Sequence, residues 1–142
     1  MVKQISVFLE NKSGRLADVT RTLGTNNIDI SALSIADTTD FGILRLIVNN
    51  PDKAEEVLKK DGFTVASTDV LAIAVEDKPG GLSQALTVLE ENSIGIEYIY
   101  AFVGKCSNEA LVILRLDKPC EAIEILKKNE IKVLEQEDIC VL

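Results

Sequence analysis

The sequence predicts an α+β protein made of two tandem ferredoxin-like βαββαβ modules, each an antiparallel sheet with helices on one face. The first observation is an internal repeat, in which Gly14 corresponds to Gly80 at an offset of 66 and Pro51 corresponds to Pro119 at an offset of 68. The second is the order of apolar periodicities, which runs strand, helix, strand, strand, helix, strand in each half. We therefore expect modules at 1–68 and 69–142, joined without a flexible linker.

The first half of each module is predicted to be a strand followed by a helix. Apolar and polar residues alternate over 4–9 and over the equivalent 70–75, as in a half-buried strand. A polar turn follows at 11–14, or at 77–81 in the second copy, and helical spacing begins after it. Gly24 would end the first helix, because glycine tolerates the left-handed conformation.

The second half of each module is predicted to hold two strands, a helix and a last strand. The second strand breaks its alternation between Ile30 and Leu33, which indicates a bulge. A third strand is expected over 42–48, after which Asn50 and Pro51 supply a helix cap and the first helical residue. The two third strands align ambiguously, because identical Ile-Leu-Arg-Leu runs in the two copies require an offset of 70.

Apolar residues also fall on the sheet face that the helices are not expected to cover. They are Phe8, Ile43, Ile47, Ala72 and Ala74. This face is too apolar for a fully solvated surface, so we expect a second chain or another protein to pack on it. The alternative is a monomer with scattered apolar surface residues.

The charge and composition of the chain exclude several classes of function. Lys and Arg number 15 against 23 Asp and Glu, a net charge of -8, which disfavours nucleic acid and anionic membranes as partners. Aromatic residues are 4% of the chain, too few for an RNA-binding module with this strand order. No apolar stretch reaches the roughly 18 residues that span a bilayer. With no secretory signal pattern at the start, we expect a cytoplasmic location.

Metal and imidazole chemistry are also disfavoured by the sequence. Histidine is absent, and the cysteines Cys106, Cys120 and Cys140 are far apart with no C-x-x-C pair. A zinc site, a Ser-His-Asp triad and a Cys-His pair all need residues that this chain lacks. We expect no metal, no cofactor and no catalytic residues, and we expect reduced, mostly buried cysteines.

The turn of each module resembles that of the ACT domain, a regulatory amino-acid-binding module found on many enzymes of amino-acid metabolism. Residues 11–16 are similar to the family's N-x-P-G-x-L turn, with Ser13 in place of the proline, and residues 77–82 differ from it at Asp77. Residues 27–30 resemble the family's N-I-x-I strand opening. The resemblance covers both halves of the chain. It implies a non-catalytic amino-acid sensor or regulatory subunit. Since the sequence shows no catalytic domain, we expect it to act in trans on a metabolic enzyme or a transporter, and the apolar outer face favours a homo-oligomer such as a dimer.

The chemistry of the turn is suited to a zwitterion. Glycine allows close approach of a ligand, and the start of the following helix offers free N–H groups to a carboxylate. Asn11 or Asp77 would accept hydrogen bonds from an α-ammonium group. The resemblance further implies that the second strand of one module faces the turn of its neighbour. The candidate ligand-binding residues are thus Asn11, Lys12, Ser13, Gly14, Arg15, Leu16, Asn27, Asp29, Ser31, Asp77, Lys78, Pro79, Gly80, Gly81, Leu82, Tyr98 and Tyr100.

Other interpretations of the same residues stay open at this point. The turns could be purely structural, with Asn11 or Ser13 as helix caps and both tyrosines as packing residues on the sheet. An acylphosphatase-like hydrolase would use Arg15 and Asn11 on phosphate, but the second copy has Gly81 and Asp77 there. A third alternative is a protein–protein adaptor that keeps the fold and binds no ligand.

Overall fold

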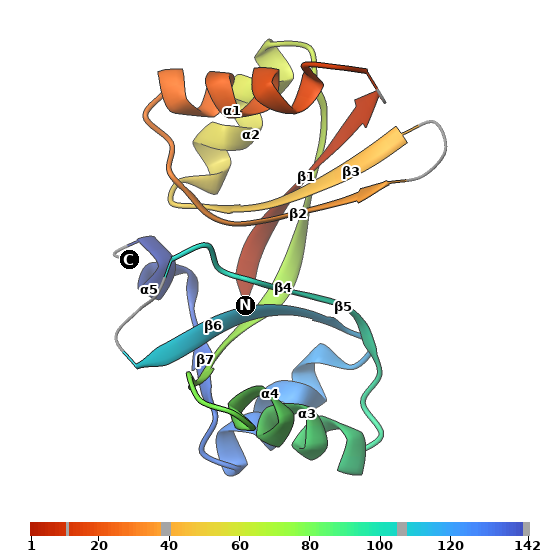
Figure 1. Cartoon of the computed structure of the whole chain (residues 1–142), viewed down its shortest axis with the longest axis vertical. Helices are drawn as coiled ribbons and strands as arrows, with labels where there is room; N and C mark the ends of the chain where they lie inside the picture. Colours follow the sequence, from red (N-terminus) through yellow and green to blue (C-terminus); the bar gives the residue numbers. More distant parts are fainter. Residues whose placement is uncertain (11, 38–40, 105–107, 141–142) are drawn as a thin grey trace.

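Two antiparallel sheets lie face to face at the centre of the molecule, with a pair of helices on the outside of each (Figure 1). The computed structural model describes residues 1–10, 12–37, 41–104 and 108–140, without the side chains of 37 and 140. The first elements are β1 (Val2–Glu10), α1 (Arg15–Thr25), β2 (Ile30–Asp37), β3 (Phe41–Val48), α2 (Pro51–Lys60) and β4 (Thr64–Glu76). The others are α3 (Gly81–Glu91), β5 (Ile96–Ala101), β6 (Glu109–Leu116), α4 (Pro119–Lys128), β7 (Lys132–Leu134) and α5 (Gln136–Cys140). The predicted fold class and element order are confirmed, with α5 as an addition.

Strand β4 belongs to both sheets. Its first part, residues 64–70, pairs with β1, and its second part, residues 71–76, pairs with β6 and over 72–74 with β7. The two sheets therefore have the orders β2-β3-β1-β4 and β7-β4-β6-β5. The expected module boundary between 68 and 69 falls inside this continuous strand, and the division of the chain at that point stays a prediction.

Strand pairing settles how the third strands of the two modules correspond. Leu44 lies opposite Val7, and Val112 lies opposite Ile73, so the equivalent positions of β3 and β6 differ by 68. The offset of 70 suggested by the identical Ile-Leu-Arg-Leu runs is wrong. A slip of two residues keeps every side chain on its own face of the strand, so the apolar pattern is the same for both offsets.

Each sheet has its own core on the side that its helices cover. The central residues are fully buried aliphatic side chains that alternate along the strands and recur along the helices. They include Leu23, Leu44, Leu46 and Leu58 in the first core, and Ile73, Leu89, Leu114 and Leu126 in the second.

The helix-free faces of the two sheets form a third core between the modules. It contains Val2, Ala32, Ile47, Val70, Ala72, Ala74, Leu111, Ile113, Leu134 and Ile139. The prediction that a second chain covers Ala72, Ala74 and Ile47 is wrong, because the other module of the same chain buries them. Burial of this face satisfies its apolar character within the chain. Of the predicted outer-face residues, Phe8 stays 44% exposed.

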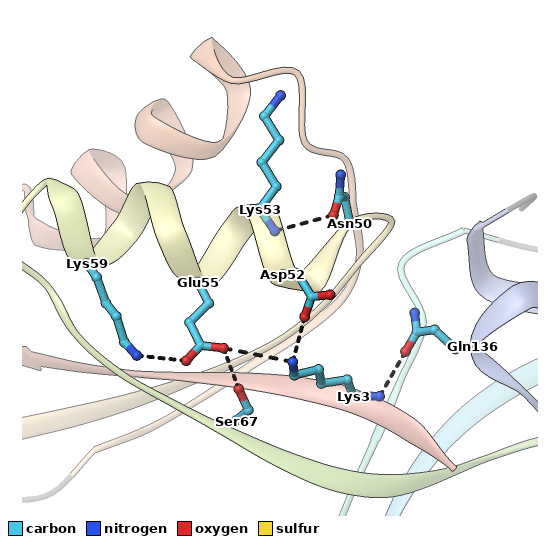
Figure 2. Close-up of polar contacts among 8 residues, drawn as sticks. All are labelled: Lys3, Asn50, Asp52, Lys53, Glu55, Lys59, Ser67 and Gln136. Carbon is cyan, nitrogen blue, oxygen red and sulfur yellow. Dashed lines mark hydrogen bonds and ion pairs between the residues drawn. The ribbon is translucent and has the colours of Figure 1, made fainter.

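The C-terminal helix α5 of the second module packs against the first module. Ile139 is buried in the core between the modules, and Gln136 Oε1 accepts a hydrogen bond from the backbone N–H of Lys3 at 2.9 Å (Figure 2). The Lys3 ammonium in turn lies 2.6 Å from the carboxylate of Asp52 and 4.0 Å from that of Glu55 on α2. One residue of β1 thus contacts a helix of the first module and the last helix of the chain.

Local signals in the sequence were mostly reliable. Asn50 caps α2 by accepting the N–H of a first-turn residue, and Pro51 starts the helix, as predicted. The bulge in the second strand is confirmed by a register shift between Ile30 and Ala32. The prediction that Gly24 ends α1 is wrong, because the helix continues to Thr25 and the left-handed residue is Asn27, with φ 59°.

Candidate functional site

Each candidate turn ends on a left-handed glycine that starts the next helix. Gly14 has φ 88° and Gly80 has φ 87°, a conformation that costs other residues about 1 kcal/mol or more. Because glycine has no side chain, neither α1 nor α3 has a side-chain cap, so the interpretation of Ser13 as a cap is wrong. Asn11 lies outside the described residues. The N–H groups of Arg15 and Gly81 are donated to Lys12 and Lys78 of the turns, and the N–H groups that follow them in the first turn of each helix carry the partial positive charge that suits an anion.

The first turn borders a small hollow of about 80 Å³. Its wall includes Glu10, Lys12, Arg15 and Leu16, together with Ile35 of β2. The Lys12 ammonium lies 3.0 Å from the carboxylate of Glu10, and this contact holds the pKa of Glu10 below its ordinary value. The turn therefore presents two cations close to one carboxylate.

Arg15 lies across the helix side of the first turn. Its guanidinium carbon is 4.7 Å from the centre of the Phe63 ring, within the range of a cation–π contact. The same group lies 3.5 Å from the carboxylate of Asp18. The Arg15 Nε is buried without a hydrogen-bond partner among the described residues. Such an unmet donor favours an anion at this place.

The second turn borders a larger hollow of about 310 Å³, between α3, the end of β4 and the connection from α4 to β7. Its polar wall is formed by Glu76, Gln84, Glu109, Asn129, Glu130 and Lys132. Glu76 is paired at 2.5 Å with Lys78 of the turn. Gly81 lines the hollow too, whereas Leu82 is exposed on the outside of α3. Asp77 and Pro79 are exposed beside it, and the backbone N–H of Asp77 is donated to the carbonyl of Asn108 at 2.9 Å.

The predicted residues of the second strand lie away from this second hollow. Asn27 is the left-handed residue after α1, and Asp29 donates its backbone N–H to Asn49 Oδ1 at 3.0 Å. The carbonyl of Ser31 accepts the N–H of Val103 at 2.9 Å, a contact between the modules. None of the three predicted residues forms part of the wall of the second hollow. Their role as ligand residues stays a prediction.

The two predicted tyrosines lie in a polar cluster between the modules. Gln4 Nε2 donates to the hydroxyl of Tyr98 at 2.8 Å, and the hydroxyl of Tyr100 donates to Gln4 Oε1. The Arg45 guanidinium carbon lies 3.9 Å from the centre of the Tyr98 ring. Burial raises the pKa of Tyr100 above its ordinary value. These contacts are those expected of packing residues, and a ligand-binding role of both tyrosines also stays a prediction.

Sequence reasoning overlooked Gln4. Its side chain is only 1% exposed, although it lies in a strand that contributes to two cores. A buried amide needs partners, and here both come from the other module. The available signal was an uncharged polar residue on the helix-free face of β1. A single sequence does not show that this residue lies opposite the two tyrosines of the second copy.

Within the described ranges, no group of three or more Cys, Asp and Glu side chains is arranged to hold a metal ion. Cys120 is exposed on α4, so its predicted burial is wrong. Cys106 and the side chain of Cys140 lie outside the described residues. In the part of the chain that the structure covers, no helix is both long and apolar enough to cross a membrane.

The paired βαββαβ units and their glycine turns are those of tandem regulatory modules. The chain matches the ACT domain pair over residues 1–142 and belongs to that family, which confirms the resemblance seen in the sequence. A search of curated proteins gave no significant match.

Solved structures show the same arrangement. The protein BT0572 from Bacteroides thetaiotaomicron is 44% identical, with a TM-score of 0.92 over 99% of this chain and 96% of that one. The ligand-free regulatory subunit of aspartate kinase from Thermus thermophilus is 14% identical, with a TM-score of 0.66 over 89% and 91%. At 14% identity, the second similarity concerns the fold.

Proposed function

We propose that this protein is a non-catalytic sensor of a free amino acid that acts in trans, as a regulatory subunit for a metabolic enzyme or a transporter. The observation that carries the proposal is the pair of glycine turns, each of which leaves the start of a helix without a side-chain cap. Membership of the ACT domain pair family supports it. The similar fold of a protein described as the regulatory subunit of aspartate kinase agrees with it. A cytoplasmic location belongs to the same proposal.

In this proposal the ligand carboxylate lies at a turn and the α-ammonium group meets a nearby carboxylate. At the first turn, Lys12 and Arg15 favour the carboxylate, and Glu10 is placed to accept from the ammonium group. At the second turn, Asp77 and Glu76 are the acidic residues beside the start of α3. Both ends of a zwitterion thus find complementary charge within a few residues.

A homodimer is part of the proposal, because the turns adjoin apolar sheet edges. Strands β2 and β5 are the outer strands of their sheets. Beside them lie apolar side chains that are 38–51% exposed, namely Leu16, Leu33, Ile35, Leu82, Ile96 and Ile99. Among the described residues, the β2 edge is bridged to Phe102 only at Ala32, and an outer strand with exposed apolar residues favours addition of another strand along its remainder. A second chain along β2 would cover Ile35, which lines the hollow of the first turn.

The proposal is tested by a thermal-shift screen of the purified protein against the twenty amino acids. A ligand at 100 times its Kd raises the free energy of unfolding by about 2.7 kcal/mol, which is a clear shift in Tm. One amino acid, or a few related ones, should produce it. A screen with no shift at millimolar concentrations would refute amino-acid sensing and leave the protein–protein adaptor.

The dimer is tested separately by light scattering. Ile35→Arg on the β2 edge should give a monomer, because it places charge in the proposed interface. Phe8→Arg is the matched control, since Phe8 is exposed to a similar degree but lies on β1, away from both edges. A wild-type protein that is monomeric with and without ligand would contradict this part of the proposal.

The hydrolase alternative is weakened by the position of Arg15. Its guanidinium lies over Phe63 and beside Asp18, and the second module has Gly81 at the equivalent position. A colorimetric assay with an acyl phosphate is the direct check, and turnover would revive that alternative.

A further inference from the structure

The helix-free faces of the two sheets are covered to different extents. In the first module, a row of side chains crosses all four strands on this face. Strand pairing places Ile43 opposite Ala36 and Phe8, and it places Phe8 opposite Thr64. We call these four residues the Phe8 row. Their neighbours along the strands β1 and β3 point into the first core, so the row faces away from the helices. Phe8 is 44% exposed and Ile43 is half-buried, and none of the four side chains is charged.

The equivalent positions of the second module are buried. Ala74 corresponds to Phe8, and Leu111 corresponds to Ile43. These two side chains are only 5% and 6% exposed. Both belong to the core between the modules, and so does Ile139 of α5. A short helix therefore helps to cover the face of the second sheet at the place where the Phe8 row lies on the first.

The first module has no counterpart of α5, because its last strand runs directly into the second module. At the offset of 68, residues 68–72 correspond to 136–140, and they are part of β4. In Figure 1, α5 lies between the two sheets at the left. At the right, beneath β2 and β3, no helix of the described part of the chain lies between them. The Phe8 row thus has the position that the other module covers with a helix.

The Phe8 row continues the apolar core between the modules. On the same face of the same two strands, Ala32 of β2 and Ile47 of β3 are fully buried in that core. Toward Ala36 and Ile43 the face extends beyond the second module and becomes accessible to solvent. A partner bound on the row would therefore extend an apolar interface that already exists within the chain.

The dimensions of the row suit a short helix. Neighbouring strands are about 4.8 Å apart, so the two ends of a row across four strands are about 14 Å apart. A helix of about ten residues has that length, at a rise of roughly 1.5 Å per residue. Because the row lies on the face of the sheet and not along an edge, side-chain contacts hold its occupant. An amphipathic helix with aliphatic residues on one side provides such contacts.

We propose that the Phe8 row binds an amphipathic helix of the partner protein, in the position that α5 has on the second module. Aliphatic side chains of that helix pack on Phe8 and Ile43. Phe8 is the central anchor, because buried aromatic side chains contribute most to such interfaces. The inference rests on the proposed action in trans and adds the surface that the partner contacts.

The test uses the sequence of α5 as the probe. A hydrocarbon-stapled helical peptide with the sequence of residues 133–142 is titrated into the isotope-labelled full chain under reducing conditions, and amide shifts are followed by NMR. Saturable shifts should appear at the Phe8 row. The same peptide with alanine at the position of Ile139 should cause no saturable shift there, because it lacks the apolar side chain that α5 buries.

Two variants locate the contact. Phe8→Ala should weaken peptide binding about tenfold or more, the usual effect of truncating an aromatic anchor. Val103→Ala is the control, because Val103 is 68% exposed but donates its N–H to the carbonyl of Ser31, at the opposite end of β2 from Ala36. This control should leave the affinity unchanged, and circular dichroism checks the fold of both variants.

Three outcomes would overturn the docking surface. The first is the absence of a saturable shift at the Phe8 row, including the case in which the peptide shifts only the second module around Ala74 and Leu111. The second is an unchanged affinity in Phe8→Ala. The third is a dimeric wild type that light scattering shows to become monomeric in Phe8→Ala, because a second copy would then cover the row.

The thermal-shift screen separates this inference from amino-acid sensing. An amino acid that stabilises the protein while the peptide does not bind leaves sensing intact and overturns only the docking surface. A peptide that binds the Phe8 row while no amino acid binds supports the surface and overturns sensing.

Discussion

Removal of the Gln4 amide should loosen the contact between the modules by a measurable amount. In Gln4→Leu the side chain keeps a similar size but loses its hydrogen bonds with Tyr98 and Tyr100. Leaving a buried polar group without a partner costs about 1–3 kcal/mol, and both tyrosines are only partly buried, so each loss lies near the lower limit. We expect a total destabilisation of about 2 kcal/mol.

Equilibrium unfolding in urea measures this loss. With an m-value of about 2 kcal/mol/M, the midpoint should fall by about 1 M at an unchanged slope. Adding Tyr98→Phe and Tyr100→Phe to Gln4→Leu should recover most of the stability, because no polar group is then left unpaired and a phenylalanine ring still stacks with Arg45. A loss below about 0.5 kcal/mol, or a triple variant less stable than the single one, would refute the reasoning.

Three further changes test the local structure. Gly24→Ala should raise the free energy of unfolding by about 0.5–1 kcal/mol, because Gly24 lies within α1 and a Cβ there meets no atom within 4 Å; a lower Tm would contradict this. Lys118→Asn should add about 1 kcal/mol, since it supplies α4 with the cap that Asn50 gives α2; an unchanged urea midpoint would show that the cap is not formed. The hydrogen bond from Lys59 lowers the pKa of Glu55. The stability difference between wild type and Glu55→Gln, about 0.5 kcal/mol, should therefore be present at pH 6 and vanish as pH falls below about 4; a difference that persists at pH 3 would exclude this origin.

The sequence was most informative where local rules decide the structure. Asn50 and Pro51 start a helix in almost any context, and the step from Ile30 to Leu33 breaks a period that a regular strand requires. The left-handed glycines at the turns follow from the same local steric rules. These features need no knowledge of what lies on the other side of the sheet.

Features that depend on the packing of the modules were missed or assigned to the wrong partner. Ala72 and Ile47 were correctly identified as too apolar for solvent, but a single chain does not reveal which surface covers them. The hollow of the second module is lined by Gly81 and Ile131, where the first module has larger residues. It becomes visible only when strand pairing and helix caps fix which residues of the first module they replace.

The shared strand β4 limits how the two modules can move relative to each other, and so how the proposed sensor would transmit ligand binding. A hinge needs a few residues whose backbone torsions are free to change, and residues 64–76 are instead held in ladders to β1, β6 and β7. Reorienting the modules would break these strand pairings and expose to solvent the core that contains Ile47 and Ala72. In the proposed function, the two modules would therefore move together as one unit, and a bound amino acid would act by changing which surface contacts form at the edges of the two sheets.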